Sequence, residues 1–206
     1  MSGLDALIAK SLDLTIKEGL GKKTSQEVEQ RLYERYGINV TQSIEEFHKL
    51  DSVLKEFFGE RTEGLEKQFL GNIVTIESKT QNPRWVTIED RFLTKLVLET
   101  FGDRDKNDIL NTVIDEPRII SEILEILKMP QTSGYRKINS LIDKGLLITQ
   151  GYNINDGKKV IKYKSIFGNV RINIKKNRII VQVQLAKELL NNSSVIQVVC
   201  GVGNSK

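Results

Sequence analysis

The hydrophobic pattern of this 206-residue chain changes its period at Gly145. Before that glycine, apolar residues recur at spacings of three and four, as on one face of an α-helix. After it, they alternate with polar residues in the runs 146–152, 160–167, 170–174 and 179–185, as in half-buried β-strands. Because a helical period does not suit a strand, the pattern predicts a mainly α protein with a small antiparallel β component.

Residues 1–74 are predicted to form a helical domain. Glycine favours helix ends, so we expect breaks at Gly19 and Gly21, at Gly37 and at Gly59. Two of the expected helix starts carry capping-box spacing, in Thr24 with Glu27 and in Ser43 with Glu46.

The polar stretch 75–89 is the predicted linker, because it contains Pro83 and no helical stripe. Trp85, the single tryptophan, lies within it. A large aromatic side chain is well suited to pack between domains, and we favour that role for Trp85 over a ligand contact.

Residues 90–185 are predicted to form a second domain that begins with helices. Apolar stripes run from 92 to 101 and from 109 to 114. Pro117 is expected at the first position of the next helix, where its missing N–H costs nothing. The last segment, 186–206, is expected to be a C-terminal tail with a short helical start and a frayed end.

The segment from Ile120 to Leu147 contains a helix, a tight turn, a second helix and an exit through glycine into a strand. Its matching positions are Ile123 and Leu127 on the first helix, Met129 in the turn, Ile138 and Leu141 on the second helix, and Lys144 to Leu147 at the exit. In these features the segment resembles the winged helix-turn-helix of ArsR-type (arsenic-repressor-like) transcription regulators from bacteria and archaea. The resemblance implies a winged helix-turn-helix DNA-binding domain over 90–185.

Two residues depart from the pattern of that family. Pro130 stands where the family has a Ser or Thr helix cap, so the cap is expected to shift by one or two residues. Gly134 stands where the family has an apolar residue, at a cost of roughly 1 kcal/mol of helix propensity. The glycine allows a close approach to a DNA or protein backbone, or is a tolerated imperfection.

The helix expected at about 131–144 is the predicted recognition helix in the major groove. Gln and Arg side chains pair with adenine and guanine edges, whereas Thr, Ser and Tyr mostly contact phosphates. The predicted DNA-binding residues of this helix are Gln131, Thr132, Ser133, Tyr135, Arg136 and Lys137. By resemblance, Gln131, Thr132, Ser133 and Arg136 face bases and phosphates.

The wing, 152–164, is predicted to lie on the DNA backbone or in the minor groove. Its predicted contacts are Lys158, Lys159, Lys162 and Lys164, and Lys162 and Lys164 are expected to share one strand face. Protection of an edge strand by charge is the alternative role.

The charge of the chain is unevenly distributed. From Lys128 to Lys187 there are thirteen Lys and Arg and two acids, which gives +11, whereas the rest of the chain carries −7. Such asymmetry indicates a polyanion-binding segment, with a solvated basic face as the alternative. Within it, the cluster Arg171, Lys175, Lys176 and Arg178 has no assigned role.

Single cysteine and histidine residues, Cys200 and His48, argue against a disulfide framework, a zinc site and a serine protease-type triad. Glu45 and Glu46 lie near His48, but a solvated helix face is the favoured explanation of that group. We therefore expect no enzyme, no metal and no cofactor. With no long apolar run and no secretory signal, the chain is expected to be cytoplasmic, without a membrane partner.

The N-terminal region resembles the small helical output domains of ammonia-oxidising archaea, the Nitrosopumilus output-domain group. The resemblance rests on the opening amphipathic helix, on Leu32 to Gly37 and on Leu50 to Gly59 with its Phe-Phe-Gly ending. It implies an archaeal regulator with a sensor or interaction domain that takes an effector or a protein partner.

The favoured hypothesis is a sequence-specific, double-stranded DNA-binding transcription regulator. A homodimer is expected, because one module reads only a short half-site, with helix 92–101 or the N-terminal domain as the contact. One alternative is a protein-interaction module built on a winged-helix scaffold. Another is a general nucleic-acid-binding protein, in which aromatic residues of the hairpin would stack on bases. Of Tyr152, Tyr163 and Phe167, however, two are expected to pack inward.

Overall fold

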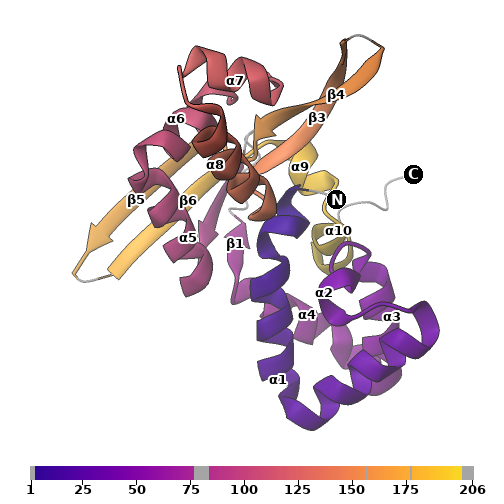
Figure 1. The fold of residues 1–206 in the computed structure, drawn as a ribbon. Coiled ribbons are helices and arrows are strands. Elements are labelled where there is room, and N and C mark those ends of the chain that lie inside the picture. The colour runs from indigo at the N-terminus through magenta and orange to yellow at the C-terminus, as the bar shows by residue number, and fades with distance from the viewer. Residues whose placement is uncertain (1–2, 77–83, 156, 177, 201–206) are drawn as a thin grey trace.

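In the computed structural model, the described residues are 3–76, 84–155, 157–176 and 178–200. The fold is mainly α with small antiparallel sheets, as the change of period predicts. The N-terminal helices occupy one end of the molecule, and two hairpins project from the other end in opposite directions (Figure 1). Asp156 and Asn177, which lie between the alternating runs of the sequence, are outside the described residues.

The N-terminal helices are α1 (Gly3–Tyr36), α2 (Val40–Ser43), α3 (Phe47–Phe58) and α4 (Thr62–Gly71), with a 3-10 turn, η1 (Gly59–Arg61). The break expected at Gly19 and Gly21 is a kink at Gly21, where φ is 73° and the two parts of α1 change direction. Thr24 lies inside α1, so the capping box predicted there is wrong. The one predicted at Ser43 is also wrong, because α3 begins at Phe47 and the capping box of this region joins Asn39 to Gln42 at α2.

The prediction of a linker over 75–89 is wrong for the described residues of that range, because they include strand residues of an antiparallel sheet. Strands β1 (Val74–Ile76) and β2 (Arg84–Ile88) form a four-stranded antiparallel sheet with β5 (Asn169–Lys175) and β6 (Arg178–Leu185), in the order β1-β2-β6-β5. Val86 and Ile88 are buried opposite Val183 and Val181. This pairing joins segments about a hundred residues apart, which a local pattern does not reveal. Pro83 lies outside the described residues.

The winged unit is built from α5 (Arg91–Gly102), α6 (Arg104–Thr112), α7 (Ile120–Ile126), α8 (Gln131–Asp143), β3 (Leu147–Asn155) and β4 (Lys158–Ser165). Between α6 and α7, Arg118 forms an antiparallel bridge with Tyr163 of β4, so a minimal third strand joins the β3–β4 hairpin. The order helix, turn, helix and hairpin over α7, α8, β3 and β4 is the one expected from the sequence of this segment. The prediction that Pro117 starts α7 is wrong, because the helix is capped at Ile119, whose N–H donates to the Glu122 carboxylate.

The C-terminal segment returns to the N-terminal helices. Helices α9 (Lys187–Asn191) and α10 (Ser194–Cys200) bring Val195, Ile196 and Val199 into the core, and α10 packs against α3 and α4. The buried Asp5 carboxylate accepts hydrogen bonds from the Ser193 hydroxyl and from the Ser194 N–H, the latter at 2.8 Å. This segment is therefore part of the body up to Cys200, and the frayed end expected at 201–206 lies outside the described residues.

One contiguous apolar cluster runs through the N-terminal helices, the sheet and the winged unit. The segments 1–74 and 90–185, which were expected to form separate domains, thus share one hydrophobic core. Two close approaches join them: the Gly145 backbone lies against the backbone of Leu7, and the Gly3 backbone lies against the Ile148 side chain. Among the described helices, none combines the length and apolar character needed to cross a membrane.

Candidate nucleic-acid interface

Helix α8 is held rigidly on its inner side. Ile138 and Leu141 are fully buried, and Gly134 packs directly against α7. A Cβ at position 134 would lie 2.2 Å from Cδ2 of Leu124, so the glycine provides the close approach of α8 to α7. The approach is to the side chain of Leu124, and not to the DNA or protein backbone that the sequence analysis considered.

The outer side of α8 presents a polar stripe. Thr132, Arg136 and Asn139 are exposed and follow one another at spacings of four and three, so they share one face of the helix. Asn139 is absent from the predicted site residues, although its helical spacing from Arg136 identifies it. Asn pairs with adenine and Arg with guanine through two hydrogen bonds each, so the stripe has the chemistry of base recognition.

The start of α8 has no side-chain cap. Pro130 occupies the N-cap position and offers no acceptor, and the Ser133 hydroxyl donates to the Pro130 carbonyl at 3.2 Å. The first N–H groups of a helix have no acceptor within the helix, and they favour anions such as phosphate. The first turn, with exposed Gln131 and Thr132, therefore suits a phosphate contact.

Tyr135 lies to the side of the outer stripe. It is exposed and, with Gln131, borders a shallow hollow of about 320 Å³ between α7 and α8. Glu125 and Lys128 of the same rim carry opposite charges. The position suits a phosphate contact by the tyrosine hydroxyl better than a base contact.

Lys137 does not face outward with the stripe. Its Nζ lies 2.8 Å from Oδ1 of Asp103 and 3.0 Å from Oδ2 of Asp105, and its side chain is 19% exposed. The two carboxylates raise the pKa of Lys137, and the lysine lowers the pKa of Asp103. Lys137 thus joins α8 to the start of α6, and the prediction of a DNA contact needs correction at this position.

The four wing lysines lie on two faces of the β3–β4 hairpin. Alternation along β4 places Lys158, Lys162 and Lys164 on one face, which confirms the shared face expected for the last two. Lys159 lies on the other face, with its Nζ 4.1 Å from the ring centre of Tyr152. A nucleic-acid backbone against the first face would meet three cationic side chains.

The aromatic residues of this region are placed as expected, with two of the three turned inward. Phe167 is buried, and Tyr163 packs against the core, whereas Tyr152 is exposed. The wing also exposes apolar side chains, Ile154 at 70% and Ile161 at 43%. A single exposed aromatic is a poor platform for stacking successive bases.

Trp85 and the basic cluster of the second hairpin lie on the sheet. The guanidinium of Arg171 stacks over the Trp85 ring, 3.9 Å from its centre. Trp85 therefore packs within the sheet surface, and the prediction of an anchor between two domains is wrong. Arg178 pairs with Glu89 at 3.7 Å.

The acidic group near His48 is arranged as a helix surface. The Glu46 carboxylate pairs with Lys49 at 2.6 Å, and this contact lowers the pKa of Glu46. Within the described part of the chain, His, Cys, Asp and Glu side chains form no group of three or more that could hold a metal ion.

Comparisons with known proteins add no relative. No protein-family model, no curated protein and no solved structure matches this chain. Only the geometry of α8 and of the hairpins therefore bears on the function of this chain.

Proposed function

We propose that this protein is a sequence-specific regulator of transcription that binds double-stranded DNA through α8. The observation that carries the proposal is the outer stripe of Thr132, Arg136 and Asn139 on a helix whose inner side is fixed by Gly134, Ile138 and Leu141. A rigid helix with a polar outer face is what major-groove recognition requires.

The wing supports this arrangement through charge. Lys158, Lys162 and Lys164 would neutralise phosphates beside the groove entered by α8, so binding should weaken steeply with salt. The proposal assigns the chain a binding role and no catalytic one. An ArsR-type archaeal regulator with this role acts in the cytoplasm, where the chromosome lies.

Neighbouring residues of α8 test the proposal. Arg136→Ala should weaken binding to a duplex recovered by selection by about 5- to 150-fold, the 1–3 kcal/mol of one lost base contact. Lys137→Ala is the matched control and should change the affinity by less than about 3-fold, because Lys137 is occupied by Asp103 and Asp105. Equal effects of the two substitutions, measured by fluorescence anisotropy at fixed salt, contradict the proposal.

The exposed apolar side chains of the wing favour a second candidate, a protein-interaction scaffold. Ile154 and Ile161 stand in solvent where a phosphate contact has no use for them. A partner bound there would survive high salt, and the chain would not retain duplex DNA in the presence of heparin.

A further inference from the structure

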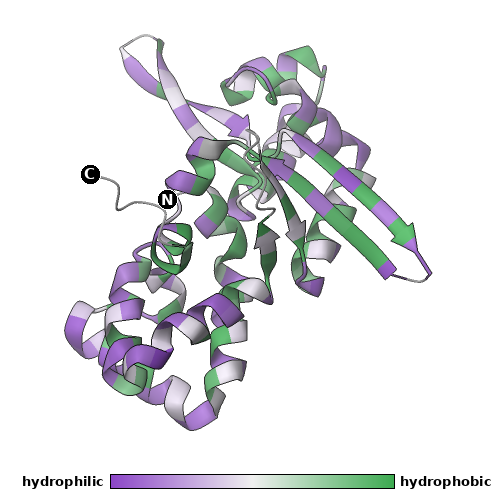
Figure 2. Cartoon of the chain, turned by 180° about the vertical axis from the view of Figure 1, so that it is seen from behind, coloured by the Kyte–Doolittle hydropathy of each residue, from purple (hydrophilic) through white to green (hydrophobic). Residues whose placement is uncertain are grey.

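The β5–β6 hairpin extends beyond the body of the protein and has one apolar face. Cross-strand pairing places Val170, Ile172 and Ile174 of β5 on the same face as Ile179 and Val181 of β6. Near the body this apolar face is covered, and Val181 is fully buried, but towards the tip Ile174 is 74% exposed. Figure 2 shows hydrophobic residues continuing along the hairpin towards its free end.

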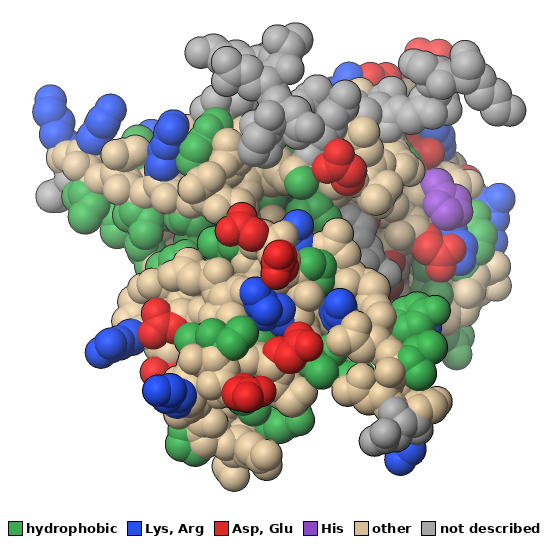
Figure 3. Space-filling model, turned by 90° about the horizontal axis from the view of Figure 1, so that it is seen from above, with side chains coloured by type: hydrophobic (Ala, Val, Ile, Leu, Met, Phe, Trp, Pro, Cys, Tyr) green, Lys and Arg blue, Asp and Glu red, His purple; other side chains and the backbone are tan. Residues whose placement is uncertain are grey.

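The opposite face of the hairpin is basic. Arg171 and Lys175 of β5 and Arg178 of β6 lie on it, and the sequence of the hairpin contains no Asp or Glu. Figure 3 shows Lys and Arg side chains along one side of the projecting arm and hydrophobic side chains along the other. Arg171 stacks over the Trp85 ring. Arg178 pairs with Glu89, whereas Lys175 has no ion pair with any described residue.

The outer edge of β5 has no strand beside it. The sheet order is β1-β2-β6-β5, so β6 is the single neighbour of β5 among the described strands. Alternate N–H and C=O groups of an edge strand point away from its sheet and can pair with another chain. Proline and inward-facing charges block such pairing, but the run from Val170 to Ile174 has no proline and its apolar face has no charged residue. The edge can therefore accept a strand of about the seven residues of β5.

A small hollow lies on the apolar side of β5. It has a volume of about 230 Å³, and Val170 and Ile172 form its β5 wall. The other walls include Phe101 of α5, Leu110 of α6 and Phe167, and none of the described residues that line the hollow is charged. In an added strand, every second side chain would point to this side of the sheet. An apolar side chain there would fill the hollow.

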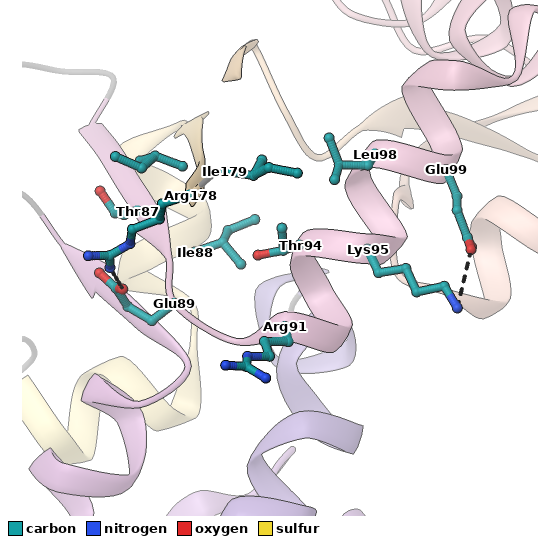
Figure 4. A pocket seen from close by; sticks show the side chains of 11 residues that line it. Thr87, Ile88, Glu89, Arg91, Thr94, Lys95, Leu98, Glu99, Arg178 and Ile179 are labelled. Atoms are coloured by element: carbon teal, nitrogen blue, oxygen red, sulfur yellow. Dashed lines mark ion pairs between the residues drawn. The ribbon is translucent and has the colours of Figure 1, made fainter. Parts of the chain in front are cut away.

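The larger groove between β6 and α5 is less suited to an added strand. Its volume is about 930 Å³, and four of its five charged side chains form two ion pairs, Arg178 with Glu89 and Lys95 with Glu99 (Figure 4). The strand edge beside it is short, because β6 pairs with β2 from Val181 onwards. The long free edge and the unpaired lysine are both on β5.

We infer that the β5 edge is a docking site for an extended acidic segment of a partner protein, which joins the sheet as a further strand. Its apolar side chains would lie over the hollow and beside Ile172 and Ile174, and its carboxylates beside Arg171 and Lys175. Main-chain hydrogen bonds give such a contact its affinity, and alternate side chains give it specificity.

Charge and apolar surface together select this occupant. The β5 strand of a second copy would bring the same cations and no carboxylate to the edge. A nucleic acid would meet the cations but would leave the exposed isoleucines of the apolar face without a partner. The inference does not depend on the proposed DNA-binding function, which uses α8 and the β3–β4 hairpin.

A labelled synthetic peptide that alternates glutamate and valine over the length of β5 is the probe. It should bind the 206-residue chain saturably, with a Kd of about 100 µM or tighter in fluorescence anisotropy at fixed salt. The matched peptide with lysine in place of glutamate keeps the apolar row but brings like charges together, so it should bind at least about 10-fold more weakly. Equal affinities, or no saturable binding of the glutamate peptide, overturn the inference.

Charge reversal at the hairpin locates the binding site. Lys175→Glu should weaken binding of the glutamate peptide about 10-fold and strengthen binding of the lysine peptide. Lys23→Glu, at an exposed position of α1, is the control and should leave both affinities unchanged. Circular dichroism should show both variants folded, because exposed positions contribute little to folding stability. The same response of the two variants overturns the assignment to β5.

Methylation of peptide amides tests the main-chain pairing. Only alternate N–H groups of an added strand face the strand beside it. N-methylation of the valines in one glutamate peptide, and of the glutamates in another, should therefore have unequal effects, with binding lost in one peptide and retained in the other. Equal effects of the two methylations overturn the inference.

Lys175→Glu also detects the two other occupants of the edge. A loss of duplex affinity, with no binding of the glutamate peptide to the unchanged chain, would assign the hairpin to DNA. A loss of self-association in sedimentation experiments would assign the edge to a second copy, and either result overturns the inference. Arg136→Ala separates this inference from the proposed function, because it should weaken duplex binding and leave peptide binding unchanged.

Discussion

The two hairpins are similar in sequence, since each alternates β-branched and polar residues and carries a cluster of basic ones, but the structure uses them differently. The β3–β4 hairpin forms a sheet of two strands, extended by the bridge between Arg118 and Tyr163, and carries three lysines on one face. The β5–β6 hairpin is half of a four-stranded sheet and extends an apolar face past the helices that cover it. Two hairpins with similar sequence patterns therefore expose different surfaces, because the elements packed beside each hairpin decide which of its side chains remain exposed.

The largest expected effect comes from disturbing the contact between α1 and the glycine that precedes the β3–β4 hairpin. Gly145 has φ of 70°, and a Cβ there would lie 2.8 Å from the backbone nitrogen of Leu7. Gly145→Ala combines a left-handed backbone with this overlap and should lower the free energy of unfolding by about 3 kcal/mol. Urea denaturation measures it.

Gly157, at the tip of the β3–β4 hairpin, provides the control for that substitution. It also has a positive φ, 73°, but a Cβ there would meet nothing within 4 Å. Gly157→Ala should therefore cost only about 1 kcal/mol, the backbone contribution alone. Equal losses at the two glycines would show that the contact with Leu7 does not matter.

The next largest effect is on DNA affinity, and it should differ between the β3–β4 and the β5–β6 hairpin. Replacing Lys158 and Lys162 with Ala should weaken DNA binding about 10-fold and reduce the slope of log affinity against log salt by about 2. The same double replacement at Lys175 and Lys176 should leave both quantities nearly unchanged. A salt titration of binding measures each slope, and indistinguishable slopes for the two variants would mean that the two hairpins do not differ in their contact with DNA.

The smallest expected effect is on folding stability and concerns Lys137, which pairs with Asp103 instead of facing outward. Lys137 lowers the pKa of Asp103, so this ion pair stabilises the fold above the ordinary pKa of Asp, and the stabilisation is lost as the pH falls below it. Because both side chains are partly exposed, we expect about 0.2–1 kcal/mol. Thermal melts from pH 7 down to about pH 2, well below the ordinary Asp pKa of about 3.9, should show a smaller acid-induced loss for Lys137→Ala than for the unchanged chain. Identical losses would mean that the pair contributes nothing.

Local patterns predicted most of the helices, including α8, and both hairpins, because helical and alternating periods are set by neighbouring residues. They failed where pairing is distant: β2 lies beside β6, and α10 returns to α3 and α4. The same distinction between local and distant contacts separates the site residues that the sequence identified from the one that it placed wrongly. The spacing of Thr132, Arg136 and Asn139 is local, whereas the capture of Lys137 by Asp103 depends on a contact between α6 and α8 that spans 34 residues.

Selection of bound duplexes from a random pool by the 206-residue chain is the direct test of DNA reading by α8. A dimer that presents two α8 helices should enrich an inverted repeat, with half-site centres about one helical turn, or a multiple of it, apart. The Arg136→Ala variant should lose the preference at one position of each half-site. Recovery of unrelated sequences, with no motif above the starting pool, would contradict the assignment of α8 as a DNA-reading helix.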